Sequence, residues 1–187
     1  MTDGNETIEE NGDDFSFISP TKGRRNLLEI MADIIGYIAD KPDAEYSIVV
    51  GTDSELSSHI MADGNDGYIK KERKGLASFV SVIVMRRIGS GAKYFWKRTT
   101  GVRTFDHHDR MIKEAYFSLE VANKLISQLR DKLNGHFYDF EIHLDIGLNG
   151  PTKEMIQEIV GLIKGNGFKA IIKPYSYAAK TVADRHV

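Results

Sequence analysis

The feature that most constrains the fold of this 187-residue chain is the order in which helix-like and strand-like apolar patterns follow one another. A helix-like period comes first, three strand-like runs follow, and helix, strand, helix, strand and helix complete the series. The predicted strands are residues 46–53, 77–87, 92–99, 137–146 and 168–173, and the predicted helices are residues 27–38, 112–133, 153–164 and 176–186.

The connections between these elements predict how the strands pair. A short glycine turn joins the second and third strands, so they pair as an antiparallel hairpin. The later strand-helix-strand unit makes the last two strands parallel through a right-handed crossover. We therefore expect an α/β domain with a five-stranded mixed sheet, antiparallel among its first three strands and parallel at the last two, flanked by helices on both faces.

Charge divides the chain into a short tail and a body. Residues 1–21 hold six acids and no base, which leaves 21 acids and 25 bases in the rest of the chain, a net charge of +4. A segment so charged and so poor in apolar side chains cannot offset the entropy of ordering it. We expect a disordered acidic tail over residues 1–22 and one domain over residues 23–187, whose mild positive charge suits a nucleic-acid partner without requiring one.

Composition also excludes several classes of protein. The chain has no cysteine, which rules out a disulfide partner, a thiol nucleophile and cysteine-ligated zinc or iron–sulfur sites. No apolar run approaches the roughly 20 residues that cross a bilayer, and the acidic start is unlike a secretory signal. We expect a cytoplasmic protein with no membrane association.

Two acids close predicted strands at the edge of the sheet where ligands usually bind. Asp53 ends the first strand and Asp145 lies at the carboxyl end of the fourth. If these strands are parallel neighbours, both carboxylates open into one crevice, where a cation must neutralise them. Hard oxygen ligands select Mg²⁺ or Mn²⁺. The alternative is that both are simply strand-terminal acids in turns.

The order of elements, with an aspartate ending the first and fourth strands and an acid on the intervening helix, resembles the ribonuclease H-like superfamily. Four motifs are similar to the bacterial YkuK-type ribonuclease H-like family. They are GTDS at 51–54, VIVMRRIGSGA at 82–92, SLEVA at 118–122 and VADR at 182–185. The likeness runs from about residue 25 to the end of the chain. It implies a metal-dependent nuclease that hydrolyses phosphodiester bonds in RNA, an RNA–DNA hybrid or structured DNA with two divalent metal ions.

The resemblance also implies a glutamate on the helix after the third strand and a further acid on the last helix. Glu114 and Glu120 lie about 110° and about 130° from the apolar stripe of that helix, so periodicity predicts neither to be buried. We take Glu114, because superfamily helices place their acid early; Glu120 is equally explained by an exposed pair with Lys124. On the last helix Asp184 is the candidate, with an acid at a fraying helix end as the alternative. The predicted catalytic and metal-ligating set is Asp53, Glu114, Asp145 and Asp184.

Other charged segments leave alternatives open. Residues 106–109 (DHHD) fit a helix-entry loop beside the site better than a zinc site. The basic cluster at residues 70–74 fits a solvated loop, or a contact with single-stranded nucleic acid. Residues 86–87 and 97–98 are positioned to form a cationic ribbon across the hairpin. A catalytically silent nucleic-acid- or protein-binding module on the same scaffold is the alternative to a nuclease.

Overall fold

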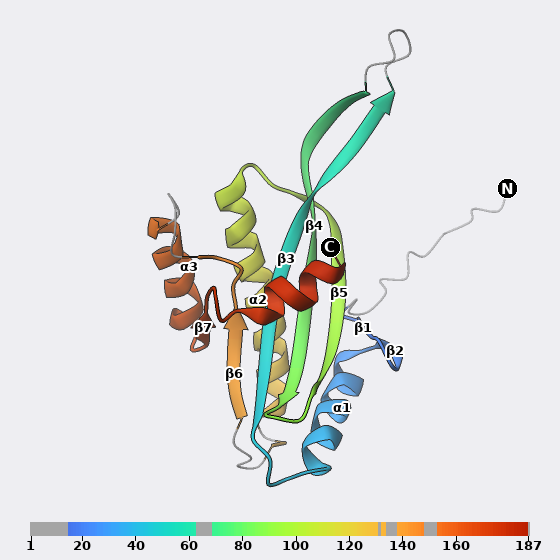
Figure 1. The fold of residues 1–187 in the computed structure, drawn as a ribbon, viewed down its shortest axis with the longest axis vertical. Coiled ribbons are helices and arrows are strands. Elements are labelled where there is room, and N and C mark those ends of the chain that lie inside the picture. Colours follow the sequence, from blue (N-terminus) through green and yellow to red (C-terminus); the bar gives the residue numbers. More distant parts are fainter. Residues whose placement is uncertain (1–14, 63–68, 131, 134–137, 148–152, 187) are drawn as a thin grey trace, which may run out of the picture.

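A mixed seven-stranded sheet forms the centre of the molecule, in the order β2-β1-β5-β4-β3-β6-β7 (Figure 1). The computed structural model describes residues 15–62, 69–130, 132–133, 138–147 and 153–186. The strands are β1 (Phe17–Ser19), β2 (Gly23–Arg25), β3 (Tyr46–Ala62), β4 (Ile69–Arg87), β5 (Ala92–Arg103), β6 (Tyr138–His143) and β7 (Lys169–Ile171). β3, β4 and β5 pair antiparallel, while β6 joins β3 and β7 joins β6 in parallel. The mixed character of the sheet and the pairing of the five predicted strands are confirmed.

The prediction of five strands in total is wrong, because β1 and β2 extend the sheet beyond β5. β1 pairs with β2 and, through Ile18 and Trp96, with β5. Three-residue strands are too short to show a period-two pattern, yet Phe15 and Phe17 are both buried and cover the edge of β5. The ordered domain thus starts before residue 23, inside the segment that we assigned to the tail; residues 1–14 lie outside the described residues.

The hairpin of β3 and β4 is much longer than predicted. We expected about twenty loop residues after Asp53, but β3 continues to Ala62 and pairs with β4 from Ile69 onward, past a register shift between Leu56 and Ser58. The paired ends form an arm that projects beyond the sheet and helices (Figure 1). The basic cluster 70–74 therefore belongs to a strand and not to a loop.

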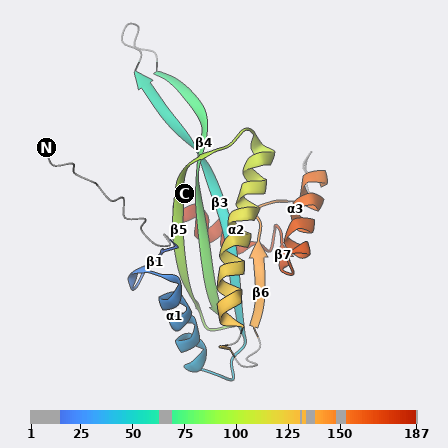
Figure 2. The same ribbon diagram turned by 180° about the vertical axis from the view of Figure 1, so that it is seen from behind.

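Helices lie on both faces of the sheet, as predicted, but unequally. They are α1 (Leu27–Ala39), α2 (His107–Leu129), α3 (Lys153–Gly165), the π-helix η1 (Ala178–Ala183) and the 3-10 helix η2 (Asp184–His186). Side chains of α1, α2 and α3 share one hydrophobic core with one face of the sheet. The short segment η1 covers the opposite face, where Val49, Val80 and Val82 meet Ala178 and Ala183 (Figures 1 and 2). None of the helices in the described ranges is long and apolar enough to cross a membrane.

The long helix α2 packs closely on the centre of the sheet because its inner face carries small side chains. Ala115 and Ala122 are fully buried, and Ser118 donates a hydrogen bond to the hydroxyl of Thr52 on β3, 2.9 Å away. The helix begins earlier than its apolar stripe suggested, because its first turn is polar and is capped by Asp106, whose side chain accepts from the N–H of Asp109. This packing brings the first turns of α2 to the middle of β3, where Glu114 and Arg110 contact Ser54.

Candidate functional site

Asp53 and Asp145 lie side by side because β3 and β6 are neighbouring parallel strands in matching register. Gly51 pairs with His143, and each aspartate follows two residues later along its own strand direction. Side chains alternate along a strand, so both aspartates belong to the face that η1 covers. The predicted juxtaposition of these two acids is therefore what the structure shows.

A small pocket of about 160 Å³ gathers three of the four predicted acids. Asp53, Glu114 and Asp145 line it together with His107 and Arg110 from the first turn of α2. The pocket lies where Asp53, midway along β3, and Asp145, just beyond the carboxyl end of β6, meet the first turns of α2. The prediction that Asp53 ends its strand is wrong, because β3 continues to Ala62 as one side of the long hairpin. Residues 106–109 thus flank the site, as expected, through His107.

Glu114 is buried, contrary to the prediction from helical periodicity. Its exposed fraction is 8%, and the hydroxyl of Ser54 donates to its Oε1 at 2.5 Å. The apolar stripe describes only the middle of α2, whereas near its start the middle of β3, at Ser54, lies against the flank of the helix. Glu120 is instead half-exposed and pairs with Lys124, 3.3 Å away. Of the two candidate glutamates, the structure brings only Glu114 to Asp53.

The pocket changes the acidity of two of its carboxyls. Burial raises the pKa of Asp53 from 3.8 to about 6, helped by repulsion from Asp145 and Asp184 and opposed by a hydrogen bond from the N–H of Ser54. Burial also raises the pKa of Glu114 from 4.5 to about 7, helped by the negative charges of Asp53 and Asp145. Arg110 opposes both shifts. Close carboxylates in a partly dry pocket hold protons unless a cation is present.

Asp145 has a cationic neighbour that the sequence did not suggest. The Nζ atom of Lys173 lies 3.0 Å from Oδ1 of Asp145. That buried oxygen nevertheless receives no hydrogen bond of good geometry within the described part of the chain. It is therefore an acceptor with unused capacity at the wall of the pocket.

The residues fit a hard divalent cation in their chemistry. Asp53, Glu114 and Asp145 line one small pocket, and Asp145 Oδ1, although Nζ of Lys173 lies 3.0 Å away, accepts no hydrogen bond of good geometry from the described residues. As they stand, no three His, Asp or Glu side chains in the described ranges are grouped closely enough to hold a metal ion. Ligation by all three would need Glu114 to turn from Ser54 and Asp145 from Lys173.

Asp184 approaches the site from the face of the sheet that η1 covers, opposite α2 and Glu114. It begins η2, is exposed and does not line the pocket, but its negative charge is close enough to raise the pKa of Asp53. The ring of His186 stacks on Trp96 of β5 with centroids 4.2 Å apart, and Arg98 donates to the carbonyl of His186. These contacts fix the short turn that carries Asp184 to the sheet.

Arg110 and Ser54 are residues of the site that sequence reasoning did not assign. Arg110 donates to the carbonyl of Ser54 at 2.7 Å, and Ser54 in turn holds Glu114. Ser54 directly follows Asp53 in the GTDS motif, and Arg110 lies four residues before Glu114. Their closeness in sequence to these predicted acids is the signal that could have identified them.

The predicted cationic ribbon across the hairpin does not form. Arg86 pairs with Ala92, and Lys97 lies opposite Ser81, so the two basic pairs are not neighbours. Arg87 is buried instead, where it forms an ion pair with Asp40 at 2.9 Å.

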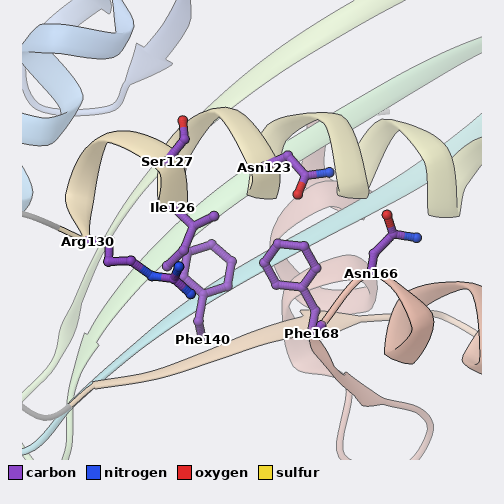
Figure 3. A pocket seen from close by; sticks show the side chains of 8 residues that line it. Asn123, Ile126, Ser127, Arg130, Phe140, Asn166 and Phe168 are labelled. Carbon is purple, nitrogen blue, oxygen red and sulfur yellow. The ribbon is translucent and has the colours of Figure 1, made fainter.

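A hollow of about 640 Å³ lies away from the acids (Figure 3). Figure 3 shows Phe140 and Phe168 between α2 and the neighbouring strands, with Asn123, Arg130 and Asn166 around them. None of the described residues that line this hollow is an acid.

Comparisons with known proteins agree with this architecture. A family model described as ribonuclease H-like matches residues 29–187. A protein of Bacillus subtilis (strain 168) named "Uncharacterized protein YkuK" is 27% identical over 190 residues, which covers 92% of this chain and 97% of the relative. No solved structure matches the chain. Because the family model covers most of the chain and the YkuK likeness spans both proteins, this protein belongs to the ribonuclease H-like family, among its YkuK-type members.

Proposed function

We propose that this protein is a divalent-metal-dependent nuclease that hydrolyses phosphodiester bonds in RNA, an RNA–DNA hybrid or structured DNA. The observation that supports it most is the convergence of Asp53, Glu114 and Asp145 in one pocket, beside the middle of β3 and the carboxyl end of its parallel neighbour β6. Membership of the ribonuclease H-like family supports a nuclease-type or nucleic-acid-binding module. The proposal goes beyond this membership by assigning catalysis to the carboxylates in the pocket.

Asp53, Glu114 and Asp145, with Asp184 as a fourth ligand, would hold Mg²⁺ or Mn²⁺. Such cations, when bound, activate water and neutralise the charge that develops on the phosphate and the leaving oxygen. The protein then needs no nucleophilic side chain of its own, which agrees with the absence of cysteine from the chain.

The remaining residues of the pocket position these carboxylates and receive the phosphate. Ser54 holds Glu114 at the pocket through its 2.5 Å hydrogen bond, which Glu114 would release in order to bind a metal ion. Arg110 is held by the carbonyl of Ser54 and lines the pocket, where it would contact a phosphate oxygen. Lys173 forms an ion pair with Asp145, and this pair would have to open for Asp145 to hold a metal ion.

The chain offers a matched pair of variants to test this proposal. Glu114→Gln and Glu120→Gln remove the same charge from the same helix, one inside the pocket and one outside it. With labelled ribo-, hybrid and branched substrates and Mn²⁺, we expect Glu114→Gln, like Asp53→Asn and Asp145→Asn, to lower cleavage by at least about 100-fold. Glu120→Gln keeps wild-type cleavage. Equal inactivity of wild type and all variants on every substrate would reject the proposal.

A second candidate function is a catalytically silent binding module, which the ion pair between Lys173 and Asp145 favours. A lysine at that distance neutralises one of the acids without a metal ion. Lys173→Met separates the two functions: a nuclease variant keeps or gains affinity for Mn²⁺, because a competitor for Asp145 is gone. A silent module gains neither Mn²⁺ affinity nor cleavage.

A further inference from the structure

We propose that Phe105, with Arg103 and Lys113 beside its ring, forms a platform on which an unpaired base of the nucleic-acid strand stacks next to the acidic pocket. The inference rests on the proposed function, and names single-stranded or locally unpaired nucleic acid as its substrate class.

Phe105 is a large apolar side chain held out in solvent. Its exposed fraction is 79%, although it follows directly on Thr104, which is buried. Two hydrogen bonds hold the backbone at Phe105: its own N–H donates to Asp109 at 3.0 Å, and the N–H of Thr104 donates to the carbonyl of Gly75 at 2.6 Å. A fixed, exposed aromatic ring is a surface prepared for a partner.

Two cations lie over this ring, within cation–π distance of its centroid. The guanidinium carbon of Arg103 lies 5.9 Å from the ring centroid, and Nζ of Lys113 lies 5.4 Å from it. Lys113 also pairs with Asp109, so the nearby acid is already neutralised. An aromatic ring flanked by cations is the arrangement by which proteins bind single strands, with the base on the ring and the phosphates on the charges.

A hollow of about 440 Å³ lies beside this platform and adjoins the acidic pocket. It is lined by Leu56, Gly75, Thr104, Phe105, Asp106, His107 and Arg110. His107 and Arg110 also line the acidic pocket, so the two hollows share a wall. The volume is of the size that small-molecule sites use, which is enough for a nucleotide.

The wall of this hollow needs glycine at position 75. Gly75 has φ +63°, and a Cβ there would lie 2.9 Å from the carbonyl oxygen of Thr104. The close approach of these two backbone segments keeps the strand before Phe105 against β4 and sets the ring at the rim of the hollow.

An unpaired base suits this geometry better than a base pair. Inside a duplex the faces of each base are covered by its neighbours, so an exposed ring has no face to stack on. A base that is already unpaired stacks on Phe105 without that cost, while its phosphates reach Arg103, Lys113 and Arg110.

Fluorescence anisotropy with the full chain in EDTA tests this proposal, because it measures binding while cleavage is off. The probes are a labelled single strand of about 12 nucleotides, as RNA and as DNA, and a blunt duplex of the same length. We expect Phe105→Ala to weaken single-strand binding by about 10-fold or more, since one base–aromatic stack is worth that much. Phe105→Tyr restores affinity to within about 2-fold, and duplex affinity does not change.

Leu28→Ala is the control, because Leu28 is an exposed apolar residue of α1, outside both hollows. Single-strand affinity unchanged in Phe105→Ala overturns the platform, as does an equal loss for single strand and duplex. If wild type cleaves with Mn²⁺ and depends on Glu114, such a result rejects the platform alone. If wild type neither binds nor cleaves, the platform and the proposed nuclease fail together.

Discussion

Asp53 and Glu114 share one pocket, and their neighbours decide which of their charge states the folded protein favours. Both carboxyls are deprived of water by burial, and each adds negative charge to the surroundings of the other. Ser54 and Arg110 oppose the effect without cancelling it, so without a bound cation the folded state keeps both protons to a higher pH than the unfolded chain does.

This preference predicts how stability depends on pH. Because the folded-state pKa values are raised to about 6 and about 7, the pair favours folding fully below about pH 4. That contribution is lost as the pH rises through 6 and 7, where the folded state must give up protons that the unfolded state has already lost. We expect wild type to lose on the order of 3 kcal/mol relative to the Asp53→Asn/Glu114→Gln variant between about pH 4 and pH 8.

Urea unfolding in EDTA at several pH values measures this difference. Comparing the two proteins cancels the contributions of the other titrating groups, and Glu114→Gln keeps an acceptor for the hydroxyl of Ser54. A difference that stays flat, or that grows in favour of wild type with rising pH, would show that the acids are not packed as described.

At the scale of elements, the short strand β1 carries more of the core than its three residues suggest. Phe17 is fully buried and Phe15 is 4% exposed, and their rings meet edge to face with centroids 5.3 Å apart. Ile18, between Phe17 and Ser19, points the other way and is 40% exposed. Adjacent residues of one strand thus differ sharply in burial.

Phe17→Ala is therefore expected to lower the free energy of unfolding by about 3–5 kcal/mol, because it empties a filled core position. The neighbouring Ile18→Ala is the matched control and should cost less than about 1 kcal/mol. Denaturant melts of both variants check the prediction. Equal costs would mean that β1 does not dock on the sheet as it does here.

At the scale of the whole molecule, the site is assembled from both faces of the sheet. Asp53 comes from the middle of β3, Asp145 from just beyond the end of β6, Glu114 from the helix on one face and Asp184 from the turn that His186 anchors to Trp96. Residues more than a hundred positions apart meet only when the complete domain has folded.

Whether a feature of the fold or the site could be predicted depends on how far apart in the sequence its residues lie. Long apolar runs identified β3, β6 and α2, and parallel pairing then placed Asp53 beside Asp145. The helical period did not predict the burial of Glu114, because Glu114 is covered by β3, at Ser54, and not by the apolar stripe of its own helix. Strand β1 is too short to show an alternating pattern of apolar side chains. The charged hairpin arm has too few apolar side chains for its sequence to predict strands. Lys173 left no signal, since its partner is distant in sequence.

The central claim, that these acids form one divalent-cation site, is tested most directly by titrating Mn²⁺ into the full chain by calorimetry at about pH 7.5, where the carboxyls are mostly ionised. If the acids form such a site, wild type and Glu120→Gln bind Mn²⁺ saturably, and Asp53→Asn and Asp145→Asn bind it at least about 10-fold more weakly. Bound Mn²⁺ then adds about 2.7 kcal/mol to the free energy of unfolding when free Mn²⁺ is 100-fold above the Kd. Absence of saturable binding, or equal affinity in wild type and both aspartate variants, would contradict a cation site at these acids.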